Sequence, residues 1–187
     1  MSITLGRRGR LAVWAGVFVL LVISPAATGE LRMGPATGPL RPADLEQLKD
    51  QRKRVAELAR RHVGTPISRS LDDLRILQRL VDRFGSRDRR LRDLAEPGFP
   101  GRARIYELQA LGVALGDVMV RNLGLEWVSF EDEHGRSRAL RGAERATLVF
   151  PVTMISKRYE GGQPVNVRSL YDSVAAKLGQ SPPHRRR

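Results

Sequence analysis

Asp117 is the residue with the strongest case for chemistry in this sequence. It lies in residues 110–120, ALGVALGDVMV, which are otherwise apolar. A helix of that composition is expected to be buried, and a buried carboxylate needs a partner for its charge. Two interpretations stay open. Asp117 forms a structural ion pair with an arginine such as Arg141 or Arg158, or it lies in a pocket and acts, like Glu107, as an acid or base.

The chain has three histidines and no cysteine. The lack of cysteine excludes a thiol enzyme, a disulfide scaffold and a Cys-ligated metal centre. His62 lies on the apolar stripe of an expected helix, has no second ligand at helical spacing, and is expected to be a packed or half-exposed core residue. His134 follows the acidic residues 131–133, but a calcium site normally offers six or more oxygens in a defined loop. A solvated turn is the simpler interpretation, and we expect no metal and no cofactor.

The remaining candidate contact residues are Trp127, Lys157 and Arg158. Trp127 and Phe130 fall on opposite faces of an expected strand, so one belongs to the core and the other is a candidate contact residue. Lys157 and Arg158 would end a later strand and point to solvent or to acids of the preceding hairpin. The sequence has no glycine-rich phosphate loop, nucleophile elbow or zinc-binding helix motif, so we assign no catalytic residue.

The first 29 residues have the three parts of a secretory signal. Arg7, Arg8 and Arg10 form a basic start, residues 11–23 are apolar throughout, and small residues follow. The apolar run is shorter than the roughly 20 residues that a transmembrane helix needs. We therefore expect residues 1–29 to be a cleaved signal peptide and the protein to be periplasmic. Anchoring to the inner membrane by an uncleaved N-terminal segment is the alternative.

The positive charge of the chain is concentrated in one part and one tail. The chain has 33 Lys and Arg against 20 Asp and Glu, a net charge of +13. Residues 41–104 hold 17 bases and 10 acids, and the chain ends in three arginines. Such a field favours anionic partners, although solvated helical faces explain the same charge without a site. Aromatic residues that would stack on bases are scarce among these helices, which argues against nucleic acid.

Apolar residues at helical spacing predict three helices in the first two thirds of the chain. Residues 86–101 between the second and the third are expected to form a short helical turn and a loop. In the third helix, Gly112 and Gly116 lower helix propensity by about 1 kcal/mol each. That cost is tolerable where another backbone approaches closely. The three helices are expected at residues 43–63, 70–85 and 103–123.

After residue 124 the pattern changes to that of strands. Residues 125–130 and 137–141 predict a hairpin whose turn includes Gly135 with a positive φ. Residues 147–157 are expected to be a third, more buried strand, in which Pro151 marks an edge position or a bulge. The three strands would form an antiparallel meander with one face packed on the glycine-bearing helix.

Asn166 can cap a final helix that ends before Gly179. The expected order is three N-terminal helices, a three-stranded antiparallel meander and a C-terminal helix, which is an α+β fold. We expect this single domain to span residues 43–179, between a linker at 30–42 and a basic tail at 180–187.

Five motifs lie between Leu108 and Val174: LGVALGD, LEWV, EDEHGR, ALR and FPVTMISKRYE. With them, this segment resembles the bacterial domain of unknown function 3806 family. The resemblance implies a fold family. It implies no activity and transfers no catalytic residue.

Export, a basic helical part and the absence of a catalytic motif favour a non-enzymatic function. We therefore expect an exported envelope protein that acts as an interaction or binding module, with an envelope protein or an anionic envelope surface as its partner. Two alternatives stay open, a carboxylate-dependent hydrolase of the periplasm and an immunity-type or inhibitor protein.

Overall fold

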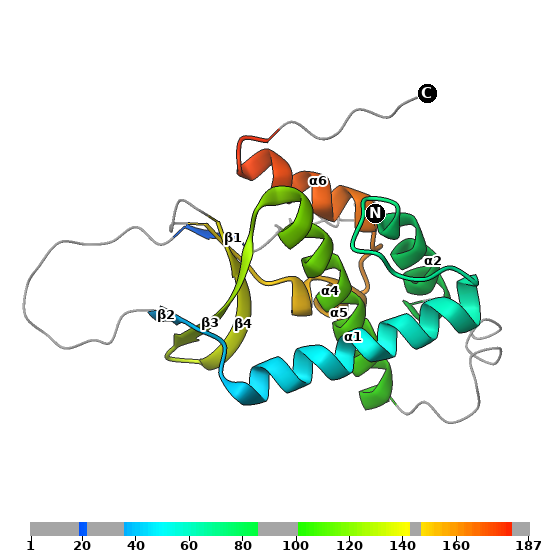
Figure 1. The fold of residues 1–187 in the computed structure, drawn as a ribbon, viewed down its shortest axis with the longest axis horizontal. Helices are drawn as coiled ribbons and strands as arrows, with labels where there is room; N and C mark the ends of the chain where they lie inside the picture. Colours follow the sequence, from blue (N-terminus) through cyan, green and yellow to red (C-terminus); the bar gives the residue numbers. More distant parts are fainter. Residues whose placement is uncertain (1–18, 22–35, 86–100, 143–146, 181–187) are drawn as a thin grey trace, which may run out of the picture.

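The structure is a computed structural model that describes residues 19–21, 36–85, 101–142 and 147–180. Most of the expected signal peptide, the expected helical turn after residue 85 and the basic tail beyond residue 180 lie outside the described residues. The described residues form an α+β fold in which a helical layer lies beside one antiparallel sheet (Figure 1).

The described part of the chain contains five helices and one sheet with the strand order β1-β5-β4-β3-β2. None of these helices is long and apolar enough to cross a membrane. The helices are α1 (Pro42–Val63), α2 (Asp73–Gly85), α4 (Gly101–Leu123), α5 (Pro151–Glu160) and α6 (Val167–Lys177). The strands are β1 (Val19–Leu21), β2 (Ala36–Gly38), β3 (Glu126–Asp132), β4 (Gly135–Arg141) and β5 (Thr147–Val149).

The ends of the helices follow local sequence signals. Pro42 begins α1, where its fixed φ suits a first turn that needs no N–H donor, and Gly64 ends it in the left-handed conformation at φ +73°. Asn166 caps α6, because its side-chain oxygen accepts a hydrogen bond from the backbone N–H of Ser169 at 2.8 Å. The predicted first, second, third and final helices are confirmed as α1, α2, α4 and α6.

Helix α4 lies at the centre of the domain, and its glycines allow close approach on two sides. A Cβ atom added to Gly112 would stand 2.3 Å from the carbonyl oxygen of Pro151. A Cβ atom on Gly116 would stand 2.5 Å from the ring of Trp127. The prediction that another backbone approaches closely is confirmed at Gly112, whereas at Gly116 the close neighbours are the side chains of Trp127 and Pro151.

The predicted hairpin is confirmed as β3 and β4. Their register pairs Asp132 with Gly135, so Glu133 and His134 form a two-residue loop. Gly135 has a φ of +111°, a value that L side chains rarely adopt.

The expectation of a third strand over residues 147–157 is wrong beyond Val149. Strand β5 is only three residues long, and Pro151 is the first residue of α5 rather than an edge or bulge position in a sheet. Proline is favoured at the first helical position, because its missing N–H has no helical partner there. The apolar run after it is compatible with a helix or a strand, and here it buries Val152 and Ile155 against α4.

The outer strands of the sheet, β1 and β2, come from segments in which no strand was expected. Strand β1 pairs with β5, and β2 pairs with β3. β1 lies within the expected signal peptide and β2 within the expected linker. Three-residue strands carry too short a pattern to be visible in the sequence.

The two faces of the sheet belong to different apolar clusters. Trp127, Leu140 and Val149 pack into the core formed with the helices. The opposite face carries a smaller cluster in which the rings of Phe130 and Phe150 meet edge to face, with centroids 5.2 Å apart. Both faces therefore carry buried residues, since Phe130 is buried and Trp127 packs against the core, and the expectation that one of the two is an exposed contact residue is wrong.

The contact at Gly112 predicts the effect of adding one methyl group. We expect Gly112→Ala to lower the free energy of unfolding by about 2 kcal/mol, because the new Cβ atom meets backbone atoms that cannot move independently. Denaturant unfolding followed by circular dichroism measures this change. The matched control is Gly38→Ala, whose Cβ atom would meet nothing within 4 Å. Equal unfolding midpoints for the two variants would contradict the close contact.

Candidate functional site

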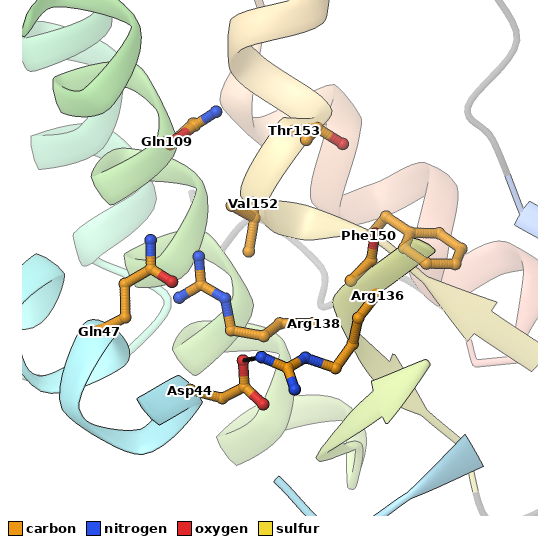
Figure 2. Close-up of a pocket in the computed structure, with 9 residues that line it drawn as sticks. Asp44, Gln47, Gln109, Arg136, Arg138, Phe150, Val152 and Thr153 are labelled. Atoms are coloured by element: carbon orange, nitrogen blue, oxygen red, sulfur yellow. Dashed lines mark ion pairs between the residues drawn. The ribbon is translucent and has the colours of Figure 1, made fainter. Parts of the chain in front are cut away.

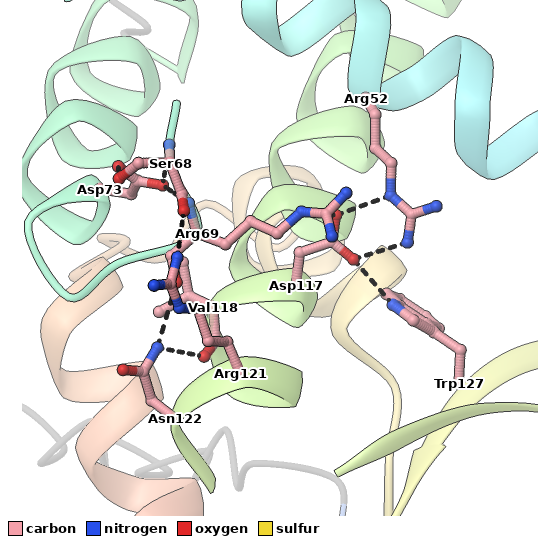
Figure 3. Close-up of polar contacts among 9 residues, drawn as sticks. All are labelled: Arg52, Ser68, Arg69, Asp73, Asp117, Val118, Arg121, Asn122 and Trp127. Carbon is pink, nitrogen blue, oxygen red and sulfur yellow. Dashed lines mark hydrogen bonds and ion pairs between the residues drawn. The ribbon is translucent and has the colours of Figure 1, made fainter. Parts of the chain in front are cut away.

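Asp117 lies at a polar junction between α1, α4 and β3 (Figure 3). Its two carboxylate oxygens accept hydrogen bonds from Nε and Nη2 of Arg52, each at 2.7 Å. The indole Nε1 of Trp127 donates a third hydrogen bond at 2.9 Å. The hydrogen bond with Asp117 is the largest cause that raises the pKa of Arg52 above its ordinary value. The carboxylate is therefore buried and fully engaged in a bidentate ion pair.

The prediction that Asp117 forms a structural ion pair with an arginine is confirmed. The prediction that this arginine is Arg141 or Arg158 is wrong, because the partner is Arg52. Arg141 lies on the other face of the sheet, where it pairs with Glu126. Arg158 lies on α5 and donates through Nη1 to the carbonyl oxygen of Met154 at 2.7 Å. Arg52 reaches Asp117 because α1 crosses α4 at this point.

The loop between α1 and α2 is fixed beside this junction. Arg69 has a positive φ of +63° and its Nε lies 3.8 Å from the carboxylate of Asp117. The carboxylate of Asp73 accepts hydrogen bonds from the backbone N–H groups of Ser68 and Arg69. From α4, Arg121 donates to the carbonyl oxygen of Ser68 at 2.7 Å. These bonds hold a strained loop in one conformation and indicate a structural role for the junction.

Glu107 also pairs with an arginine of α1, but through one carboxylate oxygen only, and its Oε2 is buried with no hydrogen-bond partner. It lies on α4, is nearly fully buried, and accepts a hydrogen bond from Nε of Arg54 at 2.6 Å. This bond is the largest cause that raises the pKa of Arg54. Both carboxylates considered for a hydrolase are therefore neutralised by arginines of α1.

A cavity of about 320 Å³ opens elsewhere, between α1, α4, β4 and α5 (Figure 2). Neither Asp117 nor Glu107 lines it. Its wall combines amide, hydroxyl and guanidinium groups with two apolar side chains. The lining residues are Asp44, Gln47, Gln109, Arg136, Ser137, Arg138, Phe150, Val152 and Thr153.

The two arginines of this pocket have different partners. The guanidinium of Arg136 lies 3.6 Å from the carboxylate of Asp44, and Asp44 also accepts a hydrogen bond from the backbone N–H of Arg41 at the start of α1. Arg138 instead donates through Nη1 to Oε1 of Gln51 at 2.7 Å. Among the described residues, no carboxylate lies within 4.0 Å of Arg138.

Burial changes the electrostatics of Arg138. Desolvation is the largest influence on this guanidinium and lowers its pKa below the ordinary value, while Asp44 and Tyr106 act in the opposite direction. Gln51 is fully buried, and its Nε2 has no hydrogen-bond partner. The pocket therefore presents a partly desolvated cation that is held by a neutral amide.

The other candidate contact residues do not join this pocket. His134 lies in the exposed hairpin loop, where its ring is 3.6 Å from the carboxylate of Glu133. Lys157 and Arg158 lie on α5 and not at the end of a strand, which corrects the expectation for both. Within the part of the chain that the structure describes, no group of three or more histidine, aspartate and glutamate side chains is arranged to hold a metal ion.

Arg138 and Gln51 are not among the residues predicted from the sequence. One signal for Arg138 was available, because alternation along β4 places Arg136 and Arg138 on the same face as the buried Leu140. A charged residue at an inward-facing strand position needs a polar partner inside the domain. The partner itself comes from α1, 87 residues earlier in the sequence, and no local pattern links the two.

Residues 89–171 match the family described as a domain of unknown function, DUF3806. This match confirms the resemblance inferred from the sequence motifs. It includes the α4, β4 and α5 sides of the pocket and leaves α1 outside. No curated protein matches the chain.

A crystal structure from Bacteroides thetaiotaomicron has a similar fold, with a TM-score of 0.60 and 16% sequence identity. The similarity covers 77% of this chain and 48% of that chain, so the present chain spans about half the length of that protein. At this identity the likeness concerns the fold alone.

The ion pair at Asp117 predicts a loss of stability on neutralisation. We expect Asp117→Asn to lower the free energy of unfolding by about 2 kcal/mol, because Arg52 keeps its charge without a counter-ion. The loss is smaller than that of a fully buried pair, since the side chain of Arg52 is 33% exposed. Thermal unfolding measures the change. Glu46→Gln is the control, because its ion pair with Lys49 is exposed and should leave the midpoint unchanged.

Proposed function

We propose that this protein is an exported, non-enzymatic binding module of the bacterial cell envelope, and that it holds its partner at the pocket between α1, α4, β4 and α5. The observation that carries the proposal is the composition of this pocket. It offers many hydrogen-bonding groups, but Asp44, the only carboxylate among its described lining residues, is paired with Arg136 and bound to the start of α1.

A hydrolytic mechanism needs a carboxylate or another base that is free to move a proton. Asp117 and Glu107 lie outside the pocket lining and are neutralised by Arg52 and Arg54. His134 lies in an exposed loop on the hairpin. These positions support binding over catalysis, because no acid or base among the described residues is both free and turned into the pocket.

The pocket is suited to recognition. Its volume of about 320 Å³ lies at the lower end of the range typical of small-ligand sites. Gln47 and Gln109 offer amides from α1 and α4, and Thr153 offers a hydroxyl from α5 (Figure 2). Such groups on three helices would fix the orientation of one ligand or of one side chain of a partner protein.

The export part of the proposal rests on the basic start, the apolar run and the small residues of the first 29 positions. We expect full-length protein produced in a Gram-negative host to appear in the periplasmic fraction with a new N-terminus near residue 30. Mass spectrometry of the cytosolic, periplasmic and membrane fractions measures both properties. Full-length protein confined to the cytosol would refute export.

The proposal that the pocket binds a partner predicts a cross-link that forms at the pocket. We expect a photoreactive residue at Thr153 to form an adduct with an envelope component, and the same residue at Arg79 on α2 to form none. The adduct should disappear when Arg138→Gln is added to the Thr153 variant and persist with Arg75→Gln. Arg75 and Arg79 are exposed and belong to a helix with no residue in the pocket. Adducts that form equally at Thr153 and Arg79 would refute the pocket as the binding site.

A further inference from the structure

The environment of Arg138 indicates what the pocket binds. Strand β4 brings this side chain to the inner face of the sheet, and its guanidinium lies between Gln47 of α1 and Val152 of α5 (Figure 2). Its hydrogen bond to Gln51 fixes the position of Nη1. The guanidinium is thus held in place by a side chain that contributes no charge.

A guanidinium that is partly removed from water and not neutralised is energetically costly. Arg52, Arg54 and Arg136, which lie on neighbouring elements, each have a carboxylate within 4.0 Å. Arg138 has a neutral amide in that place. The Nε2 group of the same Gln51 is buried without a partner, but Gln51 does not line the pocket, so Arg138 is the donor that faces a ligand. Asp44 acts on this guanidinium only from beyond 4.0 Å, and an anionic oxygen ligand would place a counter-charge in direct contact with it.

On these observations, and given the proposed binding function, we propose that the pocket binds a carboxylate through Arg138. A planar carboxylate can accept two parallel N–H donors of a guanidinium. A phosphate dianion fits less well, because among the described lining residues Arg138 is the one guanidinium without a carboxylate within 4.0 Å, and the carboxylate of Asp44 lies in the same pocket. Val152 and Phe150 offer apolar surface to the body of the ligand, and Thr153 offers it a hydroxyl group.

The test uses N-acetylglycine, which ends in a free carboxylate, and N-acetylglycinamide, which has the same shape without the charge. Two-dimensional NMR of the ¹⁵N-labelled protein follows the amide signals of residues 136–138 and 152–153 during titration. We expect N-acetylglycine to shift these signals with a saturable curve, and N-acetylglycinamide to shift them at least tenfold more weakly. Inorganic phosphate at equal ionic strength should compete at least tenfold less well than N-acetylglycine.

Variants of Arg138 test the assigned residue. We expect Arg138→Gln to weaken N-acetylglycine binding at least tenfold, and the surface variant Arg79→Gln to leave it unchanged. If Arg138→Gln fails to fold, Arg138→Lys is used, because it keeps the charge but loses the second parallel donor and should bind several-fold more weakly. Unchanged binding in the folded Arg138 variant, or no saturable shift in the wild-type protein, would overturn the proposal. Stronger competition by phosphate would overturn the assignment to carboxylates.

These results separate this inference from the proposed function. A pocket-dependent cross-link at Thr153 without N-acetylglycine binding would refute the inference that the ligand is a carboxylate. The proposed binding function would still stand. Saturable N-acetylglycine binding by a protein that stays in the cytosol would support the carboxylate ligand and refute export.

Discussion

The architecture depends on how closely α5 and β3 approach α4 at two glycines. With no side chain at Gly112, the start of α5 rests directly against α4, and at Gly116 the indole of Trp127 does the same. This contact sets the distance between Gln109 on α4 and Thr153 on α5, which stand on two walls of the pocket. The glycines therefore cost helix propensity but determine the geometry of the proposed binding site.

Buried charge in this domain serves two different purposes. At Asp117, a carboxylate inside the domain collects donors from Arg52 and Trp127 and so joins α1, α4 and β3. At Arg138, the charge has the opposite sign and its partner is the neutral Gln51. The first arrangement is closed and stabilises the fold, whereas the second retains capacity for a ligand. The same residue type, arginine, thus has a structural role in one place and a recognition role in the other.

Local signals in the sequence were sufficient for much of the fold. The cap at Asn166, the positive φ at Gly135 and the close approach at Gly112 each follow from one residue and its neighbours. The segment after Val149 was assigned wrongly, because a short apolar run with β-branched residues fits a strand as well as a buried helix. Pro151 was the deciding residue, and its role changes with whether a strand or a helix follows it.

The candidate site was less accessible to prediction, because its members are distant in the sequence. Asp117 was identified, but Arg52 lies 65 positions away and only the crossing of two helices brings them together. The pocket likewise needs α1 to lie beside β4, a tertiary arrangement that no motif encodes. Periodicity identifies the buried face of each element, whereas the pairing of those faces depends on the whole domain.

Under the proposed export, the position of β1 would give the precursor and the processed chain different sheets. Val19 to Leu21 complete the sheet by pairing with β5, yet they precede the expected cleavage position. Proteolytic maturation would take this strand away and turn β5 into an outer strand with unpaired backbone groups. The shorter form would then have an exposed edge at β5, which β1 covers in the full-length chain.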